Sequence, residues 1–175
     1  MGGRQDRAHI GALLEHDSPV YILNVMNEHT YKRERQTPMD SQVIAPTLTP
    51  SVPYDDPRQA MRWLTDVLGF RAAGVYEDPD GSVAHAELVW RTGVIYVSGR
   101  SPNSPWANVG PTSIALTAED AETVDHYYQQ AVAAGAEIIR PLHDAPYGSH
   151  QFDVRDPDGN LWTVGTYQAR IPVEV

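Results

Sequence analysis

The feature of this sequence that most constrains its fold is an internal repeat. Residues 47–52 alternate polar and apolar side chains, which is typical of a half-buried strand. Asp56-Pro57 then supplies a helix N-cap and a first-turn proline, and an apolar stripe at helical spacing continues to Gly69. Three more strands are expected after this helix, at residues 71–76, 82–90 and 94–98.

The same order of elements returns after roughly 65 residues. A strand is expected at residues 112–116, a helix follows Thr117-Ala118-Glu119-Asp120, and strands are expected at 136–139, 150–155 and 161–166. A repeated unit of this kind cannot bury its apolar face alone, so the two copies should share one structure. The expected fold class is therefore α+β, built from two βαβββ modules.

The repeat divides the chain into five segments. They are an N-terminal extension at 1–44, a first module at 45–100, a linker at 101–110, a second module at 111–168 and a C-terminal tail at 169–175. The extension contains one strand-like run at residues 20–25. Two interpretations of it stay open. It is either a flexible leader with one ordered stretch, or an arm whose strand pairs with a second subunit to satisfy its backbone.

Composition argues against several classes of function. The 175 residues include no cysteine, which rules out disulfides, thiolate zinc sites and a cysteine nucleophile. The net charge of −10 is scattered along the chain and would repel phosphate backbones, so no nucleic-acid partner is expected. No apolar run approaches the roughly 20 residues of a membrane helix, and the N-terminus lacks the pattern of a signal peptide. We therefore expect a cytoplasmic protein with no membrane partner.

Two stretches of the sequence resemble a known family. Residues 52–70, which end in Leu68-Gly69-Phe70, resemble the first module of glyoxalase and bleomycin-resistance proteins. Residues 147–162, which contain the turn Asp156-Pro157-Asp158-Gly159, are similar to the closing signature of that family. The resemblance covers residues 46–168 and indicates the vicinal oxygen chelate superfamily, which also includes extradiol dioxygenases. It implies a curved eight-stranded mixed sheet around a cleft, with the helices outside.

The resemblance also implies where a metal would be bound. Enzymes of this family hold a divalent metal with His and Glu side chains from the first and fourth strands of each module. The matching positions in this chain are Thr49, Ser113, Thr163 and one of residues 96–98, with Val97 as the best match. None of them is His, Asp or Glu, and a neutral hydroxyl is a poor ligand for a divalent ion. We therefore expect that the family's metal site is lost and that no metal or cofactor is bound.

Three other residues are candidates for catalysis. His85 and Glu87 lie two residues apart on one expected strand, so they share a face. His150 begins the matching strand of the second module. If both histidines point into the cleft, these residues could act as an acid–base pair or as a relocated metal site. The other interpretation is that they lie at strand edges, solvated or hydrogen-bonded locally.

Aromatic residues are the remaining candidates for binding. Trp106, Tyr96, Trp162 and Tyr147 could stack on a planar ligand, although core packing would explain Trp162 equally well. Together with the hydroxyl positions they form the expected ligand site. Its expected residues are Thr49, Tyr96, Trp106, Ser113, His150, Trp162 and Thr163.

These observations favour a metal-independent small-molecule binding protein of the glyoxalase/bleomycin-resistance type, which sequesters its ligand as in drug resistance. The expected ligand is aromatic or cationic and lies between Trp106 and the strand faces. The alternative is a lyase, isomerase or dioxygenase of the same fold that uses a relocated metal or a His/Glu acid–base pair. A third interpretation is a regulatory partner protein. We also expect a homodimer, because family members commonly pair modules between chains.

Overall fold

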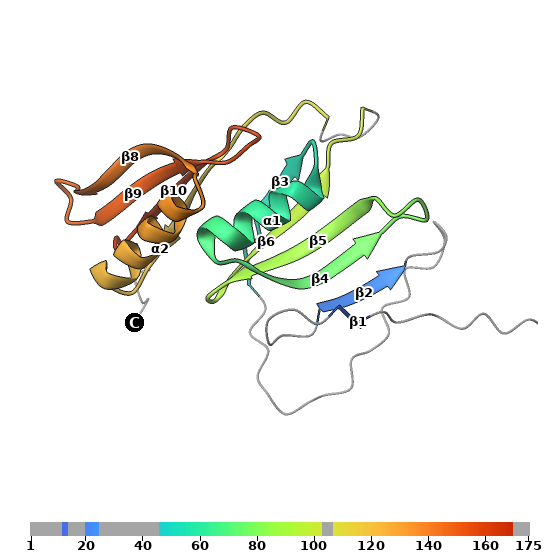
Figure 1. The fold of residues 1–175 in the computed structure, drawn as a ribbon, viewed down its shortest axis with the longest axis horizontal. Coiled ribbons are helices and arrows are strands. Elements are labelled where there is room, and N and C mark those ends of the chain that lie inside the picture. The colour runs from blue at the N-terminus through green and yellow to red at the C-terminus, as the bar shows by residue number, and fades with distance from the viewer. Residues whose placement is uncertain (1–11, 14–19, 25–45, 103–106, 170–175) are drawn as a thin grey trace, which may run out of the picture. The chain divides into compact units, whose positions relative to one another are not determined.

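The computed structural model of the chain describes residues 12–13, 20–24, 46–102 and 107–169 (Figure 1). Within these residues the chain forms ten strands and two helices. In chain order they are β1 (Ala12–Leu13), β2 (Val20–Asn24), β3 (Ser51–Tyr54), α1 (Pro57–Leu68), β4 (Arg71–Glu77), β5 (Val83–Trp90), β6 (Gly93–Gly99), β7 (Ser113–Thr117), α2 (Ala121–Ala133), β8 (Glu137–Asp144), β9 (His150–Arg155) and β10 (Leu161–Gly165). Neither helix is long and apolar enough to cross a membrane.

The strands form two separate sheets. The first has the order β1-β2-β4-β5-β6-β3 and the second has the order β7-β10-β9-β8. Read from β3, the first sheet runs β3-β6-β5-β4 before the two N-terminal strands, which is the order of the second sheet. This confirms the two βαβββ modules. The expected single eight-stranded sheet is wrong, because β3 pairs with β6 and β7 pairs with β10, so each first strand completes the sheet of its own module.

The N-terminal strand β2 extends the first sheet. It pairs in parallel with β4, in a register that sets Ile22 opposite Val75 and Asn24 opposite Glu77. The strand-like run at residues 20–25 therefore satisfies its backbone within its own chain and covers the edge of β4. The interpretation in which this strand pairs with a second subunit is not needed to satisfy it, while the expected homodimer stays a prediction.

Both predicted helix starts are confirmed, and each depends on an aspartate. Asp56 precedes α1 in extended conformation and accepts a hydrogen bond from the Gln59 N–H at 3.0 Å, with Pro57 in the first turn. Asp120 precedes α2 and accepts from the Thr123 N–H at 2.8 Å. Because these signals involve only residues three apart, they act before any tertiary contact forms.

The two compact units of the chain do not follow the order of the modules. One unit contains the described residues up to Val52 together with Arg71–Gly99, and the other contains Pro53–Phe70 together with the described residues from Arg100 onward. Helix α1 therefore belongs with the second sheet, although it precedes the first sheet's β4 in sequence. The Gln130 side chain of α2 donates to the backbone carbonyl of Asp66 in α1 at 2.9 Å, which is one of the contacts that hold the helices together.

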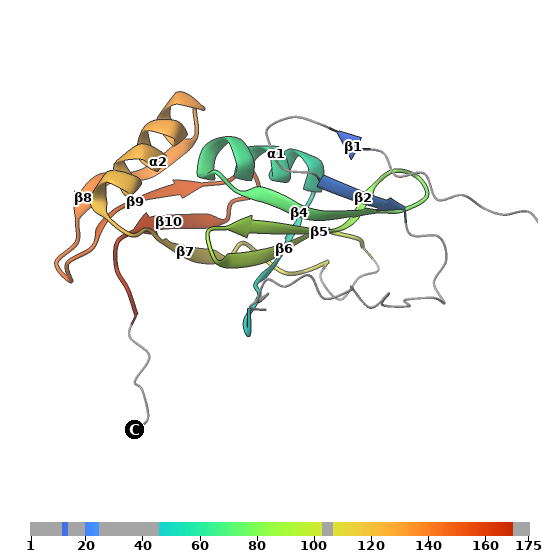
Figure 2. The same cartoon turned by 90° about the horizontal axis from the view of Figure 1, so that it is seen from below.

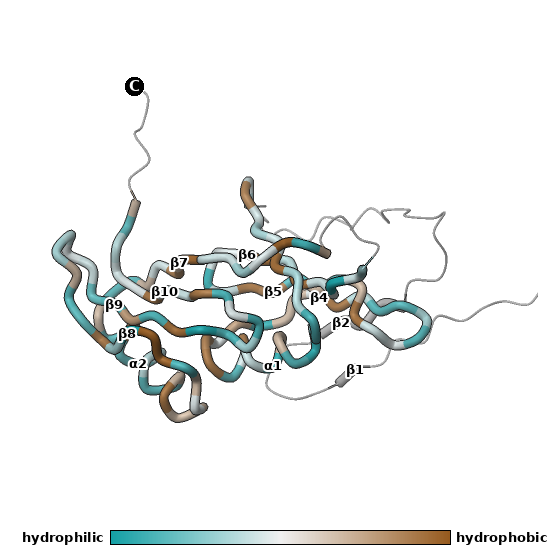
Figure 3. Tube along the Cα trace, turned by 90° about the horizontal axis from the view of Figure 1, so that it is seen from above, coloured by the Kyte–Doolittle hydropathy of each residue, from teal (hydrophilic) through white to brown (hydrophobic). Residues whose placement is uncertain are grey.

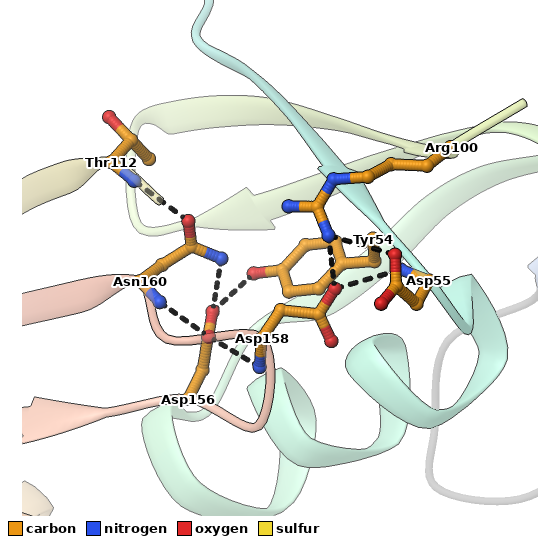
Figure 4. A network of polar contacts seen from close by, with 7 residues as sticks. All are labelled: Tyr54, Asp55, Arg100, Thr112, Asp156, Asp158 and Asn160. Atoms are coloured by element: carbon orange, nitrogen blue, oxygen red, sulfur yellow. Dashed lines mark hydrogen bonds and ion pairs between the residues drawn. The ribbon is translucent and has the colours of Figure 1, made fainter. Parts of the chain in front are cut away.

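A buried carboxylate joins the start of α1 to the second sheet (Figure 4). Asp156 is 3% exposed and begins the turn between β9 and β10. Its oxygens accept hydrogen bonds from five donors: the Tyr54 hydroxyl at 2.7 Å, the Trp162 indole at 3.0 Å, the Asn160 amide at 2.8 Å, and the backbone N–H groups of Asp158 and Asn160 at 3.1 and 2.8 Å. Burial, with the adjacent charge of Asp156, raises the pKa of Tyr54 far above its ordinary value.

An ion-paired arginine lies at the edge of the same network. Arg100 Nη1 is 2.9 Å from Asp158 Oδ2 and 2.9 Å from Asp55 Oδ1, and the Asp55 N–H donates to Asp158 at 2.8 Å (Figure 4). The closing Asp-Pro-Asp-Gly turn is thus hydrogen-bonded to Tyr54, the last residue of β3, and to Asp55, which follows it. Its two carboxylates explain why α1 groups with the second sheet.

The two faces of the second sheet have different chemistry. Phe152, Val154, Trp162 and Val164 are all 0% exposed, and the Phe152 ring packs edge-on against Tyr128 of α2 at 5.3 Å. This is the core face, which α2 covers in Figure 2. The residues between them on β9 and β10 point to the opposite face, because successive strand residues alternate. The strands accordingly carry both hydrophobic and hydrophilic positions in Figure 3.

Candidate functional site

A pocket of about 230 Å³ lies on the face of the second sheet that points away from α2. Strands β7, β9 and β10 form its floor, and residues flanking β9 and β10 form its rim. Six of its lining residues have polar side chains: Thr117, Tyr147, Ser149, Gln151, Thr163 and Tyr167. Ala115 and Gly165 line it without contributing a polar side chain.

Strand pairing explains why a glycine lies beside Gln151 in the lining of the pocket. In the β9–β10 ladder Gly165 lies opposite Gln151, and Thr163 lies opposite Asp153. A Cβ atom at position 165 would lie 2.8 Å from the Gln151 Cβ and 2.7 Å from the Ser149 Oγ, which is closer than real side chains approach. The position therefore requires glycine, because the Gln151 and Ser149 side chains occupy the place that its Cβ would take.

Two exposed tyrosines form the rim of the pocket. Tyr147 is 60% exposed and Tyr167 is 55% exposed, and their rings meet edge-to-face at 5.6 Å and 88°. The Tyr147 hydroxyl donates to Gln151 Oε1 at 2.7 Å. The backbone of Tyr167 is held on both sides, since its N–H donates to Ser149 Oγ and its carbonyl accepts from the Thr117 hydroxyl, each at 3.2 Å. The rim is thus fixed to the floor, although its ring faces remain open to solvent.

A fully buried carboxylate lies beneath the pocket. Asp153 is 0% exposed and accepts a hydrogen bond from the Thr163 hydroxyl at 2.6 Å. Its other oxygen is paired with Arg140 Nε, and that hydrogen bond and charge raise the pKa of Arg140. Both oxygens of Asp153 are therefore engaged inside the protein, and because the residue is fully buried a ligand in the pocket does not reach them.

The four positions that the family resemblance assigns to a metal do not form a donor set. Thr163 lines the pocket, and Ser113 lies on the same face of β7, two residues before Ala115. Thr49 is half-buried just before β3. Val97 is 0% exposed in a buried row with Ile95, so the choice of Val97 as a site position is wrong; Tyr96 is the residue of β6 on the other face. Across all described ranges there is no cluster of three or more His, Cys, Asp or Glu that could hold a metal ion.

The expectation that His150 points into the ligand site is wrong. Its Nε2 is 2.9 Å from Asp125 Oδ1 on α2, so the ring lies on the core side of β9, opposite to Gln151. Its Nδ1 is 2.7 Å from Asp144 Oδ1 of β8. Hydrogen bonds to Asp144 and Asp125 raise the pKa of His150. The residue ties α2 to the edge of the sheet.

The catalytic candidates of the first sheet do lie together. His85 Nε2 is 3.9 Å from Glu87 Oε1, and their side chains are 37% and 39% exposed. The His85 ring also meets the ring of Tyr96 at 4.7 Å in an edge-on contact, and Tyr76 lies 5.7 Å away on its other side. Sequence spacing correctly predicted that His85 and Glu87 share a face.

The tryptophan candidates have different outcomes. Trp162 is 0% exposed, packs edge-on against Phe70 at 5.7 Å and donates to Asp156, so it belongs to the core and cannot stack on a ligand in the pocket. Trp106 lies outside the described residues. Tyr147, by contrast, is at the pocket rim, as expected of a stacking residue.

Sequence reasoning missed Gln151, Ser149, Thr117 and Tyr167. A usable signal for Gln151 was present: Phe152 and Val154 are apolar and in phase, which puts residues 151 and 153 on the opposite face of the strand. The other three are small or terminal residues whose role depends on the turns between strands. No local pattern marks them.

Comparisons with known proteins agree with this fold. The family model described as Glyoxalase/Bleomycin resistance protein/Dioxygenase superfamily matches residues 44–164. The crystal structure of TioX from Micromonospora sp. ML1 is 32% identical, with a TM-score of 0.57, and covers 67% of this chain and 97% of that one. An uncharacterized protein of Mycobacterium tuberculosis (strain ATCC 25618 / H37Rv) is 29% identical over 130 residues, which is 70% of this chain and 75% of that protein. Lactoylglutathione lyase from Agrobacterium tumefaciens, at 21% identity, a TM-score of 0.53 and coverage of 69% and 94%, shares the fold.

Proposed function

Since this chain belongs to the glyoxalase/bleomycin resistance protein/dioxygenase superfamily, we propose that it is a metal-independent binding protein that sequesters a small molecule in the pocket of its second sheet. The observation that carries the proposal is the chemistry of that pocket. Its polar side chains are hydroxyls and one amide, and the nearby carboxylate of Asp153 is neutralised by Arg140. Such a site suits reversible recognition by hydrogen bonds and ring contacts.

Metal-assisted chemistry has less support in this chain. Divalent ions in this family are expected to need imidazole and carboxylate donors, whereas Thr163 and Ser113 offer neutral hydroxyls. The enzyme alternative would also need His150, but both of its ring nitrogens face carboxylates on the core side of β9. His85 and Glu87 remain available to an acid–base mechanism, so turnover by the first sheet is the competing proposal.

The proposal is tested by fragment titration observed in amide NMR spectra of the full chain, with and without EDTA. We expect planar fragments to shift the signals of Gln151, Thr163 and Gly165, and the same shifts to persist in EDTA. Tyr147→Ala should weaken binding severalfold by removing an exposed rim ring, whereas Tyr76→Ala, on the first sheet, should not. Binding that vanishes on chelation, or tight uptake of one divalent metal per chain, would contradict metal independence.

A further inference from the structure

Two nearly buried side-chain donors in the pocket have no acceptor among the described residues: the hydroxyl of Ser149, whose oxygen accepts from the Tyr167 N–H, and the side-chain amide of Gln151. Gln151 Oε1 accepts from Tyr147, whereas its Nε2 has no hydrogen-bond partner within residues 46–102 and 107–169, although only 2% of the residue is exposed. Every fully buried side-chain nitrogen or oxygen of the described residues has a hydrogen-bond partner. Because Nε2 has none, it is not fully buried, and it reaches the open space of the pocket that Gln151 lines. A nearly buried amide with a free N–H gains most when a ligand supplies the acceptor.

Two of the hydroxyls around Gln151, those of Thr163 and Thr117, have the opposite character. The Thr163 hydrogen is donated to Asp153, and the Thr117 hydrogen is donated to the Tyr167 carbonyl. A hydroxyl has one hydrogen and two lone pairs, so each of these oxygens can only accept a hydrogen bond from a ligand. The pocket therefore presents donors at Gln151 and Ser149 and acceptors at Thr163 and Thr117.

The donor and one acceptor are neighbours across the sheet. Thr163 lies opposite Asp153, and Gln151 lies two residues before Asp153 on the same face of β9. Thr163 and Gln151 are therefore diagonal cross-strand neighbours, a spacing that one small functional group can bridge. Thr163, Gln151 and Gly165 all line the same pocket, whose open space can hold that group.

No described residue that lines the pocket is charged, which disfavours strongly ionic ligands. A cation would find no accessible carboxylate, because Asp153 is fully buried and paired with Arg140. A carboxylate ligand would place its oxygens against the acceptor lone pairs of Thr163 and Thr117. A neutral ligand satisfies the pocket without leaving a desolvated charge.

Resting on the proposed function, we propose that this pocket recognises the edge of a neutral lactam: a ring in which a carbonyl stands beside an N–H. The carbonyl accepts from Gln151 Nε2, and the N–H donates to the Thr163 hydroxyl oxygen. The ring plane contacts the solvent-exposed parts of the Tyr147 and Tyr167 rings, which are 60% and 55% exposed. Discrimination comes from the paired donor and acceptor, since a ligand with only one of them leaves a buried group unsatisfied.

Four compounds on one bicyclic frame test this proposal: isoindolin-1-one with a carbonyl and an N–H, phthalide with a carbonyl and a ring oxygen, protonated isoindoline, and indane. Affinities are measured by amide NMR titration of the full chain. We expect isoindolin-1-one to bind about tenfold more tightly than phthalide and indane, with protonated isoindoline weakest. Equal affinity for isoindolin-1-one and phthalide, or tightest binding of protonated isoindoline, overturns the proposal.

Variants locate the effect and separate it from the proposed function. Gln151→Met should lower the affinity for isoindolin-1-one about tenfold and leave that for indane unchanged, whereas Gln129→Met, on the exposed side of α2, should change neither. If Gln151→Met does not fold, the ratio between isoindolin-1-one and phthalide in the parent protein decides alone. If indane binds as tightly as the lactam, the pocket is a binding site and only the lactam inference fails. If none of the four compounds shifts pocket signals, the proposed function of this pocket fails with it.

Discussion

The sequence Asp-Pro-Asp-Gly occurs twice in this chain, once in each sheet. Residues 78–81 connect β4 to β5, and residues 156–159 connect β9 to β10. In each turn the glycine N–H bonds to the carbonyl of the first aspartate, at 2.8 Å for Gly81 and 3.0 Å for Gly159. The N–H of the first aspartate bonds to the residue after the glycine, at 2.9 and 3.0 Å. The same four residues therefore build the same backbone turn in both places.

The side chains of the two turns have different roles. Asp78 is exposed, and Asp80 is also exposed and bonds only its neighbour Ser82 at 2.7 Å. Asp156 is 3% exposed and accepts from residues as distant as Tyr54. Local sequence thus determines the turn, while burial determines whether the turn is also a tertiary contact. Residues of the two sheets show the same contrast. His85 and Glu87 of the first sheet are half-exposed, whereas Gln151 and Asp153 of the second sheet are buried and hydrogen-bonded.

The sharpest test of this contrast replaces the first aspartate of each turn. Asp156→Ala should lower the free energy of unfolding by about 3–5 kcal/mol, because five donors lose their acceptor and two of them belong to the buried Tyr54 and Trp162. Asp78→Ala should stay within about 0.5 kcal/mol of the parent protein. Urea unfolding followed by fluorescence measures both. Similar losses for the two variants would mean that burial does not distinguish the turns.

A second pair of variants tests the backbone conformation that the two turns share. Gly81 and Gly159 have φ values of 83° and 88°, a conformation that side chains disfavour. We expect Gly81→Ala and Gly159→Ala each to lower the free energy of unfolding by about 1 kcal/mol. A Cβ at 159 would meet only Pro111 at 3.5 Å, an ordinary contact, so no extra cost is expected there. A loss at Gly159 several times that at Gly81 would show that even the backbone of the second turn depends on tertiary context.

The smallest expected effect concerns His150, which begins the strand of the second sheet that matches the strand of His85. Hydrogen bonds to Asp144 and Asp125 raise the folded-state pKa of His150 above its usual 6.5. Its stabilising contribution is therefore fully present below about pH 6.5 and is lost as the pH rises through the raised folded pKa. His150→Gln should remove roughly 1 kcal/mol at pH 5.5 and little at pH 9. Unfolding measured at both pH values checks this, with Asp144→Asn expected to weaken the same pH dependence; a pH-independent loss would contradict it.

The fold was predictable because its signals are local and occur twice. Asp56 and Asp120 cap helices through residues three positions away, and the strand alternation needs no partner to be read. The extent of β8 was not predictable: the sequence suggests residues 136–139, but the strand runs to Asp144. Pro141 cannot donate to a ladder, yet a register shift between Arg140 and His143 accommodates it. Such an irregularity depends on the neighbouring strand β9.

The candidate site was predictable only in part. Thr163, chosen as a ligand-site residue from its spacing to the Asp-Pro-Asp-Gly turn, lines the pocket, and its role as a ligand contact stays a prediction. His150 and Val97 were assigned to the wrong face, and an error of one residue is enough to reverse the face of a strand residue. Gln151 depends on the absence of a side chain at Gly165, which becomes visible only when β9 and β10 are paired. A pocket of this kind depends on how the strands pair and not on any short sequence motif.

The placement of α1 with the second sheet has a consequence for synthesis of the chain on the ribosome. Tyr54 and the helix after it emerge early, but their partner Asp156 is 102 residues further along. At typical translation rates that interval lasts on the order of 5–20 seconds, during which the apolar stripe of α1 has no completed sheet of its own unit to pack on. A nascent chain halted between β6 and β7 would therefore hold the strands of one unit and a helix whose own unit is still incomplete. Such a halted chain is the state in which this protein would most need a chaperone.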